Sequence, residues 1–320
     1  MALIAYHASH EQFKPSELLN YAVKAQQAGF TAIHSSEHFV PWSKNQGESG
    51  FSFAWMGAVL QATSIPCGMI CAPGYRYHPA VVAQAIATYG EMFPGRYWIE
   101  LGSGEAMNEV ITGIEWPYKT ERNARLLECV RIIRRMLKGE TVTHNGLVNT
   151  WNAKLYTRPE EVPMIMGAAI SVETAAWLGK WSDGLVTVHK PLEELKEMLQ
   201  AFDNAGGKGK KRYLKVQLSY ARDYQSAADG AFEQWRNNVI APEKLGDLYT
   251  VEDFEEAGKK VTIKQVEEAV HISPDLNYHL NYIREYIKLG FDCIVLHNVN
   301  RDQETFINDF SAVINDLKAG

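Results

Sequence analysis

The stretch SELLNYAVKAQQAGFTAIHS, residues 16–35, carries the pattern that decides the fold. Its first part predicts an amphipathic helix that Ser16 caps and that ends at Gly29. A short apolar run, residues 30–35, follows at once and predicts a strand. A glycine that ends a helix just before an apolar strand is common punctuation, and residues 289–291, Leu-Gly-Phe, repeat it before the last predicted strand.

The same unit recurs along the chain. Eight short apolar runs predict strands, most of them followed by a helical stretch: residues 2–8, 30–35, 65–72, 96–101, 164–167, 184–188, 214–220 and 291–297. Continuous apolar strands that alternate with helices predict a parallel sheet covered by helices. Eight such units favour an α/β fold of the (β/α)8 TIM-barrel type, with a doubly wound sheet as the alternative.

One barrel domain is expected to span residues 1–320 and to carry two insertions. Residues 142–158 alternate in the manner of a hairpin, and residues 242–275 are charged and partly helical. Insertions of this kind usually lie over the C-terminal face of a barrel, where active sites are built.

Composition excludes several classes of protein. With 46% apolar and 22% charged residues, the bulk of the 320-residue chain is not disordered. A formal net charge of −6 provides no basic field for nucleic acid or anionic lipid. No apolar run has membrane-spanning length, the first residues do not resemble a signal peptide, and four cysteines are too few for a disulfide framework. We therefore expect a cytoplasmic protein.

The first candidate site follows the second predicted strand, at the catalytic end of a barrel. Glu37, His38 and Trp42 combine an acid, a side chain that titrates near neutral pH and a flat aromatic face. A loop histidine with local hydrogen bonds and a packing tryptophan is the alternative. His34 and His38 also match an inverted zinc-protease pattern, but that pattern needs a helix. In a strand the two histidines lie about 13 Å apart, at ~3.3 Å per residue, so we expect no metal.

The second candidate, directly after the fourth predicted strand, is residues 102–105, Gly-Ser-Gly-Glu, with the nearby Asn108. A dinucleotide fingerprint would need a third glycine where Met107 stands. The glycines instead favour a turn that lets backbone approach a planar ligand, with Glu105 as an acid. A tight turn in which Glu105 and Asn108 serve the start of a helix is an equal alternative.

A third candidate is residues 167–171, Gly-Ala-Ala-Ile-Ser, which follow a late strand and lead to a serine at a helix start. In barrels such a backbone cradle often holds a phosphate, although a simple N-cap with close packing also explains it. Lys190, after the next strand, is a candidate for binding an anion.

Five segments of the chain together resemble one enzyme family. Residues 9–13 (SHEQF), 38–42 (HFVPW), 75–81 (YRYHPAV), 83–85 (AQA) and 102–109 (GSGEAMNE) occur in the order typical of the luciferase-like superfamily of (β/α)8 flavin and deazaflavin oxidoreductases. The resemblance is greatest to the branch of F420-dependent glucose-6-phosphate dehydrogenases, and within it to a subgroup of flavinoid oxidoreductases that do not use F420. It implies FMN as the cofactor, with F420 as the alternative.

The resemblance also implies roles for single residues. His38 matches the base that takes the hydroxyl proton of the substrate, and Glu105 matches the acid that protonates the cofactor ring. Trp42 matches an aromatic that shapes the site, and Glu11 a carboxylate that orients the histidine. The family carries a non-prolyl cis peptide after the third strand, expected here near residues 69–70. The residues expected to bind the cofactor are Glu37, Met69, Ile70, Gly102, Ser103, Gly104, Asn108, Gly167, Ala168, Ala169 and Ser171.

Substrate binding departs from the family pattern. The glucose-6-phosphate enzymes hold phosphate with two lysines and an arginine; Lys190 and Lys244 match the lysines, but Ala269 occupies the arginine position. Loss of a bidentate phosphate partner argues against glucose 6-phosphate. We expect hydride transfer to a small polar organic substrate, with F420-dependent sugar or alcohol dehydrogenation, or luciferase-type monooxygenation, as alternatives. The expected partners are a second copy of the chain, in a homodimer, and a separate flavin reductase.

Overall fold

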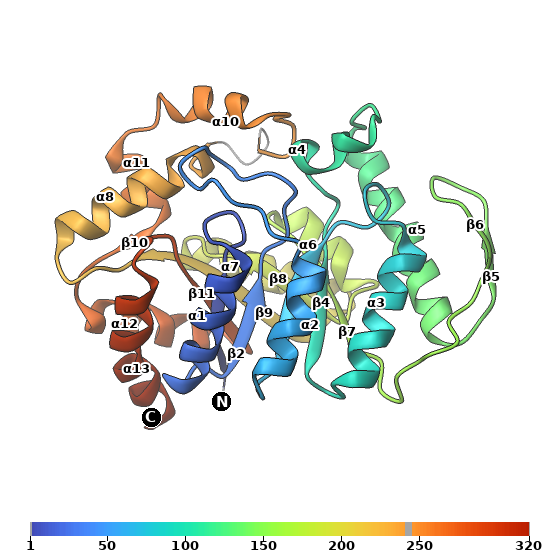
Figure 1. The fold of residues 1–320 in the computed structure, drawn as a ribbon, viewed down its shortest axis with the longest axis horizontal. Coiled ribbons are helices and arrows are strands. Elements are labelled where there is room, and N and C mark those ends of the chain that lie inside the picture. The colour runs from blue at the N-terminus through green and yellow to red at the C-terminus, as the bar shows by residue number, and fades with distance from the viewer. Residues whose placement is uncertain (1, 241–244, 320) are drawn as a thin grey trace.

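The computed structural model describes residues 2–240 and 245–319. Eight parallel strands close into a barrel, which confirms the (β/α)8 prediction over the doubly wound alternative (Figure 1). In the order in which they pair, the strands are β1 (Leu3–Ala8), β2 (Ala32–Ser35), β3 (Cys67–Cys71), β4 (Tyr97–Leu101), β7 (Met164–Ala168), β8 (Gly184–Val188), β9 (Lys211–Ser219) and β11 (Cys293–Asn298). Strand β11 pairs with β1 from Leu3 opposite Cys293, which closes the ring.

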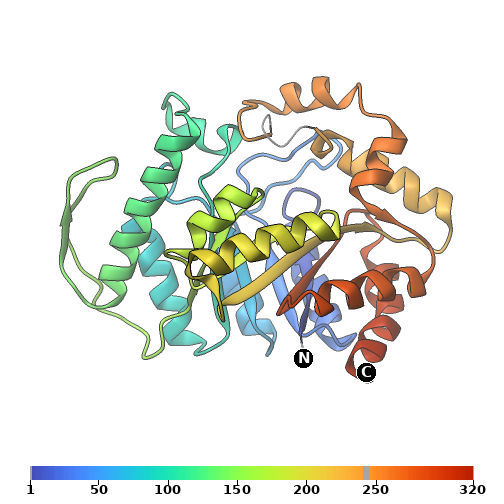
Figure 2. The ribbon, with the colours of Figure 1, turned by 180° about the vertical axis from the view of Figure 1, so that it is seen from behind.

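Most helices cover the outside of the barrel, as two opposite views show, whereas α10 (Val251–Gly258) and α11 (Ile263–Ala269) lie over one end of it (Figure 1, Figure 2). The others are α1 (Pro15–Gln27), α2 (Ser52–Ala62), α3 (Pro79–Met92), α4 (Ala106–Glu109), α5 (Lys119–Leu137), α6 (Val172–Gly179), α7 (Leu192–Phe202), α8 (Tyr224–Trp235), α12 (Leu276–Lys288) and α13 (Gln303–Ala319). The predicted cap of α1 is wrong: Lys14 is the N-cap and Ser16 lies inside the first turn. Pro15 takes the first helical position, where its missing N–H leaves no helix bond unmade.

The inside of the barrel is filled by every second residue of each strand. Its lower layer is apolar and consists of Ala5, Ala32, Trp98, Met166, Val186, Tyr213, Cys293 and Val295. Gly68 makes room for Trp98, since a Cβ at this glycine would lie 1.9 Å from the indole ring. The larger core lies between the outward faces of the strands and the helices.

The end of the barrel at which the C-termini of the strands lie is called the barrel mouth here. Toward the mouth, the next interior layer becomes polar and contains His7, His34, Glu100, Lys215 and His297. Strand periodicity fixes these positions, because each lies two residues beyond a member of the apolar layer. Most of the candidate residues predicted from the sequence lie in the loops just above, whereas Met69, Ile70, Gly167 and Ala168 belong to strands β3 and β7.

The first insertion forms the expected hairpin. Strands β5 (Val142–His144) and β6 (Thr150–Ala153) pair antiparallel. The hairpin lies beside α5, where His144 Nε2 meets Glu128 Oε2 at 3.0 Å, so it stands at the side of the mouth rather than across it (Figure 1).

The described part of the second insertion, residues 245–275, lies over the mouth, as predicted. Helices α10 and α11, orange in Figure 1, belong to it. The short strand β10 (His271–Ile272) then pairs with the end of β9. No helix in the described part of the chain combines the length and the apolar composition needed to cross a bilayer.

Candidate active site

Three loops at the barrel mouth bring candidate residues together. Glu11 follows β1, His38 follows β2 and Glu105 follows β4. His38 Nε2 lies 3.9 Å from Glu11 Oε1 and 3.6 Å from Glu105 Oε2. The Glu105 side chain is 34% exposed and that of His38 is 11% exposed, so a molecule in the mouth can reach both. One imidazole nitrogen thus faces two carboxyl groups that are far apart in the sequence.

Glu11 is a buried carboxylate held by hydroxyl groups. Ser9 Oγ and Ser36 Oγ donate to its Oε2 at 2.7 and 2.8 Å. Its Oε1 has no hydrogen-bond partner among the described residues. Burial acts to raise the pKa of Glu11, but the charge of His38 and the Ser9 hydroxyl outweigh it, and the pKa is lowered. Glu11 is therefore an ionised group with a free oxygen beside His38.

Asn108 orients His38. Its Oδ1 accepts a hydrogen bond from the backbone N–H of Phe39 at 2.8 Å, and its Nδ2 donates to His38 Nδ1 at 3.1 Å. Nδ2 also lies 3.3 Å from Glu105 Oε2. Because Nδ1 accepts, we assign the proton of the neutral ring to Nε2, which faces the carboxyl groups. These contacts occupy the amide, so the expected cofactor contact of Asn108 stays a prediction.

Trp42 forms a wall beside His38. The two ring centroids lie 4.5 Å apart. Phe254 of α10 packs edge-on against Trp42, with centroids 5.0 Å apart. The insertion over the mouth therefore supports the site. The sequence around Phe254 contains no pattern that predicts its contact with Trp42 in the loop after β2.

The structure separates the two interpretations of Glu105. The residue occupies the N-cap position of α4, yet its side chain makes no capping hydrogen bond. It points to His38 and Asn108 instead. Burial raises the pKa of Glu105, and the charge of His38 offsets this in part. A carboxyl group with a raised pKa keeps its proton to higher pH, so the geometry favours an acid over a helix cap.

We expect Glu105→Gln to lower kcat by about 10²-fold or more, because glutamine cannot exchange a proton. The melting temperature should change by less than about 4 °C, since no cap is lost and Asn108 keeps an acceptor. Turnover assays and thermal denaturation check the two expectations together. A large fall in melting temperature with unchanged kcat would contradict the acid role and restore the capping interpretation.

Four inward-facing side chains form the floor of the mouth: Ile70, Ala168, Val188 and Lys215. All four point into the barrel and are nevertheless partly exposed, so open space lies above them. Gly102 extends this surface, because a Cβ at this glycine would come within 3.9 Å of the Ala168 methyl group. The apolar part of this floor, formed by Ile70, Ala168 and Val188, is bordered by glycine backbone and suits a planar aromatic ring.

Strand β3 corrects one expectation. The peptide bond expected to be cis near residues 69–70 is trans, as are all bonds of the described residues. Met69 pairs with Ile99 and Ile70 with Glu100 in a regular parallel ladder, whereas a cis non-prolyl bond would cost about 3–4 kcal/mol. The Met69 side chain is buried in the core beneath the helices, so Ile70 alone of this pair faces the mouth.

Glu37 belongs to an ionic cluster that sequence analysis missed. Arg76 Nη1 and Nη2 donate to its two carboxylate oxygens, each at 2.7 Å, and Tyr77 OH donates to Oε1 at 2.8 Å. Glu109 accepts from the same guanidinium at 3.2 Å. A pocket of about 450 Å³ beside His38 is lined in part by this cluster. Arg76 lies in one of the segments that resemble the family, residues 75–81, but that motif carries no information about the partners of the guanidinium.

The other two segments predicted to bind the cofactor, residues 102–105 and 167–171, lie at the ends of neighbouring strands, because β4 pairs with β7. In residues 102–105, Ser103 Oγ accepts from Lys119 Nζ at 2.8 Å, a cation that sequence analysis also missed. In residues 167–171, Ser171 caps α6 by accepting from the Thr174 N–H at 3.3 Å. The capping alternative for Ser171 is thus realised, and the backbone before it is the part available to a ligand.

The structure gives little information on the two lysines predicted to bind the substrate. Lys190 Nζ lies 3.4 Å from Glu194 Oε2, one helical turn away. Lys244 lies outside the described residues. Substrate binding by these two lysines stays a prediction.

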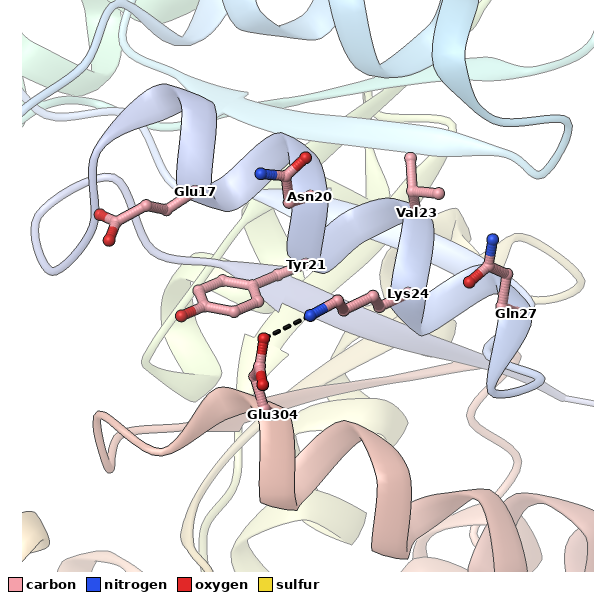
Figure 3. Close-up of a pocket in the computed structure, with 7 residues that line it drawn as sticks. All are labelled: Glu17, Asn20, Tyr21, Val23, Lys24, Gln27 and Glu304. Carbon is pink, nitrogen blue, oxygen red and sulfur yellow. Dashed lines mark hydrogen bonds and ion pairs between the residues drawn. The ribbon is translucent and has the colours of Figure 1, made fainter.

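Another pocket lies on the outer surface between α1 and α13 (Figure 3). It is lined by Glu17, Asn20, Tyr21, Val23, Lys24, Gln27 and Glu304. Lys24 and Glu304 form an exposed ion pair across it. Such pairs contribute about 0–1 kcal/mol, and this pocket brings together no acid and base of the kind found at the mouth.

Residues 2–293, most of the chain, match the model of the luciferase-like monooxygenase family. The chain belongs to the luciferase-like monooxygenase family. It is an oxidoreductase of the luciferase-like superfamily, which confirms the resemblance drawn from the motifs.

Similar members of the luciferase-like family are named for one cofactor. An F420-dependent glucose-6-phosphate dehydrogenase of Kribbella flavida is 34% identical over 96% of each chain. One of Rhodococcus erythropolis is 34% identical over 96% of this chain and 95% of its own. A solved F420-dependent secondary alcohol dehydrogenase, in complex with an F420–acetone adduct, is 28% identical, covers 98% of both chains and has a TM-score of 0.91. These relatives favour the F420 alternative and do not support FMN as the first choice.

Proposed function

We propose that this luciferase-like oxidoreductase transfers hydride between an F420-type deazaflavin and the carbinol carbon of a small alcohol, or the corresponding carbonyl compound. The observation that carries the proposal is His38 Nε2, which lies between Glu11 and Glu105 at the mouth, at 3.9 and 3.6 Å. Relatives named as F420-dependent dehydrogenases support it, one of them 34% identical over 96% of this chain.

The mouth fits a deazaflavin. Ile70, Ala168 and Val188 offer an apolar floor to a planar ring. The backbone of residues 102–104 and 167–170 would hold the ring edge and a phosphate-bearing tail. When bound, the ring supplies the carbon that accepts or releases hydride.

The residues of the chain handle the proton on the substrate oxygen. His38 donates from Nε2 to that oxygen and stabilises the negative charge that develops there during carbonyl reduction. Glu105, whose pKa is raised, gives the proton to the substrate oxygen during carbonyl reduction and takes it back during alcohol oxidation. Glu11, whose pKa is lowered, is a fixed negative charge beside His38. The resemblance assigns the base to His38, whereas the bond from Asn108 to its Nδ1 favours a hydrogen-bond donor. Trp42 shields one side of the imidazole from water.

We expect the purified protein to bind F420 at least about tenfold more tightly than FMN, a difference of about 1.4 kcal/mol. Titration with each cofactor, followed by cofactor fluorescence, measures both dissociation constants. F420 on the protein should then lose its visible absorbance with 2-propanol more readily than with glucose 6-phosphate, because Ala269 provides no bidentate phosphate partner.

The outcomes separate the parts of the proposal. Tight FMN binding with weak F420 binding would overturn the deazaflavin assignment. Tight F420 binding without reduction by any alcohol, and without oxidation of reduced F420 by ketones, would overturn the dehydrogenase reaction while keeping the cofactor.

A further inference from the structure

Lys215 is a cation inside the barrel that the proton chemistry above does not use. Strand β9 turns Tyr213 and Lys215 inward, and Tyr213 packs edge-on against Trp98 in the apolar layer, with ring centroids 5.4 Å apart. Lys215 therefore stands one level higher, on the floor of the mouth. It is partly exposed there, while its interior neighbours His7 and His297 are buried, so its accessible surface faces the open mouth.

Three carboxyl groups act on the charge of Lys215 without bonding to it. Glu11, Glu100 and Glu105 all attract its charge, yet within residues 2–240 and 245–319 none of them accepts a hydrogen bond from the ammonium. Burial lowers the pKa of Lys215, and the three carboxyl groups offset this in part. An ammonium has three donors, and leaving them unsatisfied in a largely enclosed place is costly. These donors are available to a molecule that occupies the mouth.

A chain of hydrogen bonds beside Lys215 ends at an unpaired atom. His34 Nε2 meets Glu100 Oε2 at 2.9 Å, and His34 Nδ1 meets His7 Nδ1 at 2.8 Å. Burial acts to raise the pKa of Glu100, but His34 outweighs it and the pKa is lowered, so Glu100 is the acceptor. With both rings neutral, His34 Nδ1 accepts from His7, and His7 Nε2 remains a buried acceptor without a partner in the described structure.

Two more buried polar atoms near Lys215 lack partners among the described residues: Glu11 Oε1 and His297 Nδ1. His7 and His297 share the interior layer of Lys215, and burial and the ammonium of Lys215 both lower the pKa of their rings. Buried polar groups are nearly always hydrogen-bonded in folded proteins. The buried polar groups beneath the mouth are therefore not fully paired within the described residues.

We propose that Lys215 is a ligand-binding residue of the mouth, whose ammonium donates hydrogen bonds to an acceptor oxygen of the bound molecule. That oxygen is a ring carbonyl of the cofactor or an oxygen of the substrate. The inference rests on the proposed function in taking the mouth as the active site. A purely structural cation is bonded to its carboxylates, as Arg76 is to Glu37, and Lys215 is not.

Acetylation of the wild-type protein tests the proposal without any assay of turnover. Acetic anhydride modifies accessible amines, and peptide mass spectrometry reports Lys215 beside Lys211, an exposed lysine of the same strand. Saturating F420 should reduce acetylation of Lys215 about tenfold or more and leave Lys211 unchanged.

The outcomes identify the oxygen that Lys215 binds. Protection by F420 alone assigns the oxygen to the cofactor, and protection that needs F420 with 2-propanol assigns it to the substrate. If F420 does not bind, the proposed function fails, and protection by FMN alone would still support Lys215. If neither F420, F420 with 2-propanol, nor FMN protects Lys215 from acetylation, the proposal that Lys215 binds a ligand is overturned.

Variants provide the second measurement. Lys215→Met should weaken cofactor binding, or raise KM for 2-propanol, by about tenfold or more, the effect of losing a hydrogen bond from a charged donor. Lys215→Arg should recover most of the loss, and Lys211→Met should behave as wild type. A Lys215→Met protein with a lower melting temperature but unchanged dissociation constant and KM would overturn the proposal, because a structural cation gives that result.

Discussion

His38→Ala should lower kcat by roughly 10²–10⁴ while cofactor binding survives. The imidazole presents Nε2 to the two carboxyl groups at the mouth, and alanine leaves no donor for the substrate oxygen. The apolar floor, formed by residues of other strands, stays intact. Steady-state turnover with 2-propanol and fluorescence titration with F420 measure the two effects separately.

A matched control is His144→Ala, which removes another partly exposed histidine paired with a glutamate, on the hairpin beside α5. It should leave kcat unchanged. Turnover of His38→Ala at the wild-type rate would remove His38 from the mechanism. Loss of F420 binding together with turnover would instead assign His38 to the cofactor site.

Arg76→Met should lower the free energy of unfolding by about 3–5 kcal/mol, the usual cost of breaking a buried ion pair from one side. The guanidinium is bonded to Glu37 and Glu109, and the three side chains are 8%, 3% and 1% exposed. Burial already raises the pKa of Glu109, and Arg76 counteracts it. Methionine leaves two buried carboxylates without a cation. Denaturant unfolding at neutral pH measures the loss.

The pH dependence of this loss has a definite sign. A buried carboxylate without its cation has a folded-state pKa above its unfolded value of about 4.3, so it destabilises the fold above that pH. The deficit of Arg76→Met should therefore shrink as the pH falls toward about 4–5, where the carboxyl groups take up protons. A deficit that stays constant with pH would show that lost packing, rather than uncompensated charge, is its cause.

Arg222→Met is the matched control, because Arg222 is 72% exposed and pairs with Asp309 at the surface. Its loss should be within about 1 kcal/mol. The triple variant Arg76→Met, Glu37→Gln, Glu109→Gln should regain part of the stability, since it removes the charges together. Equal losses for Arg76→Met and Arg222→Met would contradict the burial argument.

The strands were predictable because each is short and apolar and carries its own boundaries. All eight predicted runs coincide with barrel strands, and β9 begins at Lys211, earlier than the expected 214. The first residues of β9 were not predicted because Lys211 and Arg212 are charged and do not belong to the apolar run. The hairpin over 142–158 was predictable for the same reason, since alternation with period two is a local signal.

The sequence predicted which residues belong to the candidate site better than it predicted the contacts between them. The motifs named Glu11, His38 and Glu105, and the structure brings these three together. The motifs could not show that Asn108 clamps the His38 ring or that Arg76 neutralises Glu37. Each of these contacts joins loops that follow different strands, so it depends on how the strands are paired.

By itself, the sequence determined the repeating strand and helix units, the family and most members of the candidate site, because hydrophobic period and motif order are properties of neighbouring residues. The tertiary structure alone decided that the bond at residues 69–70 is trans and that Lys215 stands on the floor of the mouth. It also decided that Phe254 of the insertion supports Trp42. The physical reason is barrel closure: register around a closed ring sets which inward side chains share a level, and no local pattern in the chain carries that information.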